Sequence, residues 1–171
     1  MKNRRNLHLF LWPLSFLLLM LMTAGPAATA ANPTIPAGLK EYTQLEIGAI
    51  LADGTKSTLR ELLAAKVFLQ GKISRTPQLK SDEIVLYRMV ITCCIADAEP
   101  YGVLVKLPGK NDFHDGEWAA VEGTLQLPPI DERVKFIEPV ANLIPREKIY
   151  PLFTATKAYK ITAPTQEYLY Y

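Results

Sequence analysis

The segment that most constrains the fold runs from Ile84 to Pro108 and holds two strand-like stretches around a short turn. Ile84–Ile95 and Tyr101–Leu107 are rich in branched and aromatic residues, which favour strands. Ala96–Pro100 between them has the composition of a turn. The segment predicts two neighbouring strands, and both cysteines of the chain lie at the end of the first one.

The first stretch alternates in hydrophobicity, as expected for a strand with one buried face. Its odd-numbered residues from Val85 to Ile95 are all apolar, whereas Arg88, Thr92 and Cys94 interrupt the even-numbered set. We therefore expect the odd face to line a core, with Cys93 pointing inward and Cys94 outward.

Other stretches with short-range periodicity predict a mainly β fold with one short helix. Interior glycines at Gly71 and Gly123 suggest bent strands, as in a small closed sheet. We expect an OB-like, five-stranded, partly closed barrel, with a β-sandwich as the alternative. With the two strands above, Val67–Ser74, Trp118–Leu125 and Val134–Ile144 are the five predicted strands. A short first strand is expected before them at Leu45–Leu51, and a helix at about Leu59–Ala65 that begins with a Thr58-x-x-Glu61 capping box.

The amino terminus has the pattern of an export signal. Basic residues at positions 2, 4 and 5 precede an apolar stretch and an Ala28-Thr29-Ala30 sequence, as in a secretory signal peptide. The alternative is an uncleaved membrane anchor. We expect residues 1–30 to be the signal peptide, 31–44 a linker, 45–144 the barrel domain, and 145–171 an extended tail rich in tyrosine and proline that packs on the barrel. The predicted location is periplasmic or otherwise extracytoplasmic.

The charge balance argues against a nucleic-acid partner. Without the three basic residues of the predicted signal peptide, 16 Lys and Arg residues face 17 Asp and Glu residues. A near-neutral chain offers no basic surface for phosphates, and we expect contact with a membrane only if the leader is uncleaved. The chain contains no phosphate-binding glycine loop, and one histidine follows residue 30, so we do not expect an enzyme or assign catalytic residues.

The candidate site lies around the two cysteines. Arg88, Thr92 and Cys94 are the polar residues on the predicted outward face, and Asp97 follows in the turn. We take these four as candidate ligand-binding residues. Cys93, Cys94 and Asp97, with His114 from a later loop, contain the ligand atoms that zinc prefers. Adjacent strand residues face opposite ways, however, so both thiols reach one metal only if the strand is locally distorted.

Two further interpretations of the cysteines stay open. A disulfide between neighbours is strained and easily reduced, which is typical of regulatory bonds. A buried free cysteine, in contrast, behaves as a small apolar side chain, and this is the expected role of Cys93. Asp97 has a competing role as well, because a short carboxylate readily accepts hydrogen bonds from backbone amides of a turn.

The residues from Met89 to Val103 resemble the carboxy-terminal domain of YcgQ-like proteins, a domain of unknown function in proposed subunits of a two-component membrane permease. The Cys93-Cys94-x-Ala96-Asp97-Ala98 sequence is the most specific part of this resemblance. A Trp118-x-x-Val121-x-Gly123 pattern and the tyrosine-ending tail from Pro164 are also similar. The resemblance covers about residues 45–171.

The resemblance implies an accessory domain of an integral membrane permease, with an associated link to zinc. Family members place this domain after several membrane-spanning helices, whereas one hydrophobic segment precedes it here. The expected form is therefore a free or singly tethered, exported binding domain. The alternative is an extracytoplasmic metal-binding or thiol-redox protein acting through Cys93 and Cys94.

Overall fold

The computed structural model describes residues 34–53, 55–144 and 148–171. The predicted signal peptide lies outside these ranges. Within them, no helix has both the length and the apolar character needed to cross a bilayer.

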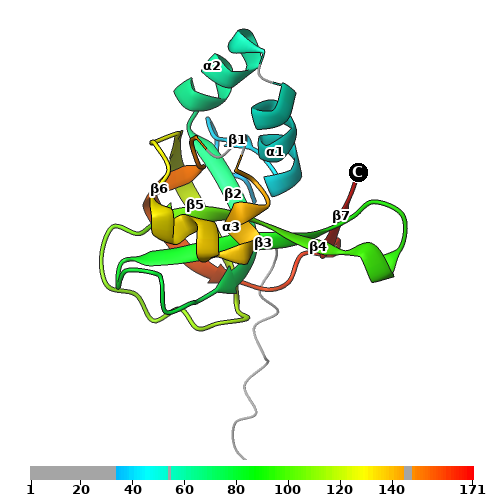
Figure 1. Ribbon diagram of the computed structural model, residues 1–171. Coiled ribbons are helices and arrows are strands. Elements are labelled where there is room, and N and C mark those ends of the chain that lie inside the picture. The colour runs from blue at the N-terminus through cyan, green and yellow to red at the C-terminus, as the bar shows by residue number, and fades with distance from the viewer. Residues whose placement is uncertain (1–33, 54, 145–147) are drawn as a thin grey trace, which may run out of the picture.

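The described strands form one sheet in which five strands close into a ring (Figure 1). Around the ring, β2 pairs with β5, β5 with β6, β6 with β4, β4 with β3, and β3 again with β2. The β4–β6 pairing is parallel and the others are antiparallel. The mainly β class is thus confirmed, in a single sheet rather than the two sheets of a sandwich. The ring strands are β2 (Val67–Ser74), β3 (Glu83–Ile91), β4 (Glu99–Lys106), β5 (Trp118–Gln126) and β6 (Leu152–Ile161), and the short strands β1 (Lys40–Glu41) and β7 (Tyr168–Tyr170) extend the sheet.

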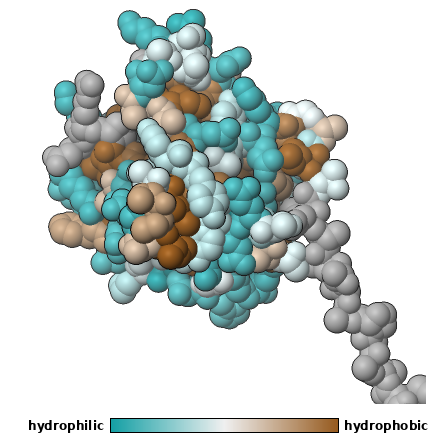
Figure 2. All heavy atoms as spheres, turned by 90° about the vertical axis from the view of Figure 1, so that its right-hand side faces the viewer, coloured by the Kyte–Doolittle hydropathy of each residue, from teal (hydrophilic) through white to brown (hydrophobic). Residues whose placement is uncertain are grey.

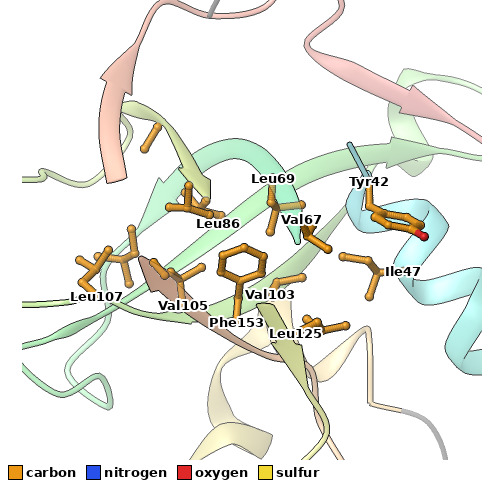
Figure 3. Packing of buried hydrophobic residues seen from close by; sticks show 14 of the residues in the cluster. Tyr42, Ile47, Val67, Leu69, Leu86, Val103, Val105, Leu107, Leu125 and Phe153 are labelled. Atoms are coloured by element: carbon orange, nitrogen blue, oxygen red, sulfur yellow. The ribbon is translucent and has the colours of Figure 1, made fainter. Parts of the chain in front are cut away.

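The main hydrophobic core fills the inside of this ring. Figure 3 shows the aromatic ring of Phe153 surrounded by aliphatic side chains from the other strands. Alternate residues of β2 and β5 point inward, as their sequence pattern predicts. The inward residues of these two strands include Val67, Leu69, Ile73, Ala119, Val121 and Leu125.

Residues 148–171 contribute two strands to the sheet, whereas we expected the tail to pack on the outside of the barrel. Strand β6 runs from Leu152 to Ile161 and pairs with both β5 and β4, so it closes the ring. Strand β7 then pairs in parallel with the end of β3. Pro151 and Pro164 lie outside both strands, so they interrupt neither one.

The predicted inner face of β3 is wrong. The even-numbered Ile84 and Leu86 lie in the main core, whereas the odd-numbered Val85 belongs to a second cluster outside the ring. Both faces of β3 are covered by other parts of the chain, and both are therefore apolar. Only contacts made by distant residues distinguish the two faces, so the sequence of β3 alone does not show which face points inward.

The outer cluster is built by the segment that we predicted as a strand at Val134–Ile144. This segment instead contains a 3₁₀-helix, η3 (Glu132–Phe136), and a short helix, α3 (Glu138–Ala141). Pro139 lies in the first turn of α3, where a missing amide hydrogen costs nothing. The members of the outer cluster are Val85, Leu104, Val134, Ile137, Val140 and Tyr150.

The predicted strand at Leu45–Leu51 is also wrong, because these residues form helix α1 (Gln44–Asp53). The sequence carried a signal for this helix in Thr43-x-x-Glu46. The Glu46 carboxylate accepts a hydrogen bond from the Thr43 amide at 2.7 Å, and the Glu46 amide donates to the Thr43 hydroxyl at 3.2 Å. This reciprocal pair is a capping box. Ile47 and Leu51, one turn apart, bury one face of the helix.

The second helix was predicted correctly as a helix, but the prediction placed its first residue too late in the chain. Helix α2 spans Lys56–Ala64 and follows Thr55, so Thr58 lies inside its first turn instead of capping it. The Thr58 hydroxyl donates to the carbonyl of Thr55 at 3.1 Å. Helices α1 and α2 lie together at one end of the molecule (Figure 1).

Gly123 marks the bend in β5, and replacing it tests the closure of the ring. The β5–β6 register shifts between Glu122 and Gly123, and a Cβ atom on Gly123 would lie 2.0 Å from the backbone oxygen of Thr154. We expect Gly123→Ala to lower the free energy of unfolding by about 3 kcal/mol, because the backbone must move to relieve the overlap. Gly109→Ala is the matched control, since no atom lies within 4 Å of its added Cβ. Equal stabilities of the two variants in urea denaturation would contradict this packing.

Candidate functional site

One carboxylate organises the connection between β3 and β4. Strand β3 ends at Ile91, and the chain turns through the two cysteines into a 3₁₀-helix, η2 (Ile95–Asp97). Asp97 accepts a hydrogen bond from the Cys93 amide at 2.8 Å with one oxygen and from the Cys94 amide at 3.2 Å with the other. The Asp97 amide donates back to the Cys94 carbonyl at 3.0 Å. The predicted role of Asp97 in stabilising the turn is confirmed, and the same contacts occupy both of its oxygens.

Both cysteines are free and exposed, which corrects the prediction that Cys93 is buried in the core. Two causes combine. The odd face of β3 does not point into the ring, and the strand ends two residues before Cys93, so alternation no longer applies there. Thr92, a candidate ligand-binding residue, is exposed on the same turn. The structure therefore places Thr92, Cys93 and Cys94 together on an accessible surface.

Arg88 is buried, unlike the other candidate ligand-binding residues. Its guanidinium lies over the ring of Trp118, 5.3 Å from the centroid, and donates hydrogen bonds to the carbonyls of Glu167, at 3.0 Å, and Gln166. Desolvation lowers the pKa of Arg88, although the guanidinium stays charged at any physiological pH. Arg88 thus holds the segment before β7 against the sheet and is not available to an external ligand.

His114 lies in a different loop and has its own partners. Its amide donates to Glu117 at 2.8 Å, and its Nδ1 atom lies 3.5 Å from the Glu117 carboxylate. This amide hydrogen bond, with Lys160, lowers the pKa of Glu117. The residues that the structure describes contain no group of three or more His, Cys, Asp or Glu side chains placed to hold a metal ion. The predicted four-residue metal set is therefore not assembled.

Exposed apolar side chains lie on the cysteine turn and on the tail that pairs with the end of β3, and we did not predict this surface. Ile95 is 64% exposed, although alternation placed it in the core, and Tyr171 is 83% exposed. Tyr171 lies beside the end of β3, because its amide donates to the carbonyl of Ile91, and Ile95 follows in the connection that leaves this strand end. Figure 2 looks onto this side of the molecule and shows apolar surface between hydrophilic regions. The tyrosine-rich tail was the available sequence signal. We call Cys93, Cys94, Ile95, Tyr170 and Tyr171 the turn surface.

A shallow hollow adjoins this surface. It has a volume of about 210 Å³ and lies between helix α1 and the residues that follow α3. Its wall includes Gly48 of α1, Tyr101 of β4, Leu143 and Tyr171, so the end of the chain contributes to both features. The turn surface thus meets a concave region at Tyr171.

The fold and this surface define a small, mainly β domain that presents exposed apolar residues on the β3–β4 connection, at Ile95, and beside it at Tyr170 and Tyr171. The chain belongs to the DUF1980 C-terminal domain family, whose sequence pattern matches residues 53–171. This result confirms the family resemblance inferred from the Cys93-Cys94-x-Ala96-Asp97-Ala98 sequence.

The chain is similar to a longer bacterial protein. It is 26% identical over 110 residues to UPF0703 protein YcgQ of Bacillus subtilis (strain 168). The match covers 64% of this chain and 34% of that protein, so the chain spans about a third of the length of this relative.

Two solved structures are weakly similar to the chain. One is a DUF3299 family protein from Pseudomonas aeruginosa PAO1, with a TM-score of 0.38, 14% identity, and coverage of 74% of this chain and 98% of that one. The other is a proposed aspartyl-tRNA synthetase from Leishmania major Friedlin, with a TM-score of 0.39, 12% identity, and coverage of 80% and 23%. Neither similarity supports a functional argument.

Proposed function

We propose that this protein is an exported, non-enzymatic binding domain that serves as an accessory of an integral membrane permease. The observation that carries the proposal is the turn surface, where Ile95 is held exposed on a turn fixed by Asp97. Exposed apolar side chains that gather on one side of a domain are typical of protein interaction sites. The family resemblance suggests that the partner is a membrane permease, and the amino-terminal pattern suggests that the protein is exported.

The geometry of the turn supports a preformed binding surface. Because the Asp97 carboxylate holds two successive amides, the loop that carries Ile95 loses little conformational freedom on binding. Tyr170 and Tyr171 add aromatic area beside the end of β3, and tyrosine is enriched at protein interfaces. The adjacent hollow can take one apolar side chain of a partner.

Site-specific photo-crosslinking tests this function in membranes that contain the full chain. A photoreactive phenylalanine analogue at position 95 is expected to crosslink to one protein with several membrane-spanning helices. The same analogue at position 136 is the matched control, because Phe136 is 74% exposed but lies on η3, outside the turn surface.

The crosslink should disappear when Tyr171→Ser is added, while the protein level in the membrane fraction stays the same. Crosslinks of equal yield from positions 95 and 136, or no crosslink to an integral membrane protein from position 95, would refute the proposal.

A further inference from the structure

The β3–β4 connection presents two accessible thiols on neighbouring residues. Both Cys93 and Cys94 are free and exposed, and Asp97 fixes the backbone that carries them. We propose that the two sulfur atoms form a binding site for one soft monovalent metal cation of the Cu(I) class. This inference does not rest on the proposed partner, since the site is complete within this chain.

The ligand set favours a soft monovalent ion over zinc. Structural zinc takes four protein ligands and catalytic zinc takes three, whereas the described part of the chain assembles no group of three. Asp97 already accepts a backbone hydrogen bond with each oxygen, and His114 is paired with Glu117 in another loop. Thiolates prefer soft ions such as Cu(I), and two sulfur ligands are sufficient for an ion that accepts linear coordination.

Neighbouring cysteines also resist disulfide formation, the reaction that consumes other pairs of free thiols in an oxidising compartment. Consecutive Cα atoms lie about 3.8 Å apart, whereas a disulfide favours a Cα separation of about 4.4–6.8 Å. A bond between Cys93 and Cys94 is therefore strained and easily reduced. The pair can persist as two thiols where more distant cysteines would be joined.

Asp97 acts as a positioning residue for this site. Its carboxylate bridges the amides of Cys93 and Cys94, so the two Cα atoms keep a constant relation to the turn. Preorganised ligands lose less entropy when the ion binds. On binding, each thiol releases its proton to solvent, and the two thiolates with one monovalent cation carry a net charge of minus one.

Competition with a chromogenic Cu(I) chelator tests the site in the reduced, purified full chain without oxygen. We expect one equivalent of Cu(I) to be withdrawn from the chelator, together with a thiolate-to-copper absorption band in the ultraviolet. Zn(II) should show no stoichiometric binding in the same assay. Cys93→Ser and Cys94→Ser should each abolish binding, because one sulfur does not form the chelate.

Two further variants separate the site from general effects on folding. Asp97→Asn should retain one equivalent but bind about 10–100 times more weakly, the usual effect of removing an outer-shell partner. His114→Ala is the control and should bind like the unaltered chain. Circular dichroism should show the same fold for all variants.

The proposal is overturned by absence of stoichiometric Cu(I) binding, by retained binding in either serine variant, by equal binding of Zn(II), or by a Cys93–Cys94 disulfide that resists mild reductant.

Discussion

Phe153→Ala is expected to destabilise the protein by about 4 kcal/mol, because it empties the centre of the ring-enclosed core. Phe153 is fully buried on β6 and lies among side chains from the other ring strands (Figure 3). Urea denaturation followed by circular dichroism measures the change in the free energy of unfolding.

Phe136→Ala provides the control for this substitution. It removes the same aromatic group from an exposed position on η3, so we expect a change below about 0.5 kcal/mol. A small effect at Phe153 would mean that the segment from Leu152 to Ile161 does not close the ring, and the topology described above would then be wrong.

Arg133→Ala is expected to cost about 3 kcal/mol, at the low end for loss of one partner of a buried ion pair, because Arg133 itself is partly exposed. Its guanidinium holds the buried Glu83 carboxylate at 2.6 and 2.9 Å and also contacts Asp131 at 2.6 Å. These contacts join the start of β3 to η3, so the substitution leaves the buried carboxylate with only the exposed Lys80 ammonium, 3.8 Å away, as an ion-pair partner.

The pH dependence of this effect gives a second measurement. Burial alone would raise the pKa of Glu83, but hydrogen bonds from Arg133 and the Lys80 amide outweigh burial, and its pKa lies below the reference value of 4.5. A carboxylate with a lowered pKa stabilises the fold above its unfolded-state pKa, and this contribution is lost as the pH falls through the folded-state value. The stability difference between the unaltered chain and Arg133→Ala should therefore shrink as the pH falls below 4.5.

Two variants control this experiment. Lys135→Ala breaks an exposed ion pair with Glu132 and should change stability by less than about 1 kcal/mol. Adding Glu83→Gln to Arg133→Ala removes the buried charge that has lost its closest partner and should recover part of the loss at neutral pH. If the double variant is less stable than the single one, the charge of Glu83 is not the cause.

Local patterns predicted those elements whose evidence lies within a few residues. Strands β2 and β5 follow clear alternation, because the outward residues between their core side chains are mostly polar or small. The role of Asp97 could also be predicted, since its partners are three and four residues away. Helix α1 could have been recognised from Thr43-x-x-Glu46, but its apolar residues were interpreted with the period of a strand.

Elements that depend on distant residues were predicted wrongly. The face of β3 that points inward depends on η3 and α3, which begin more than 40 residues later and cover the opposite face. Cys93 is exposed because the odd-numbered face of β3 points away from the ring and because β3 ends at Ile91, before Cys93 is reached. Arg88 looked accessible because its partners, the carbonyls of Gln166 and Glu167, come from nearly 80 residues further along the chain.

The sequence by itself determined the mainly β class, the family, the turn stabilised by Asp97 and the adjacency of Cys93 and Cys94, because each depends on residues that are close in the chain. The tertiary structure alone decided that β6 completes the ring, that Arg88 is buried and that both thiols are exposed. The physical reason is that burial is a property of the whole packed chain: a residue is covered only when distant segments reach it, and no local pattern records where they come from.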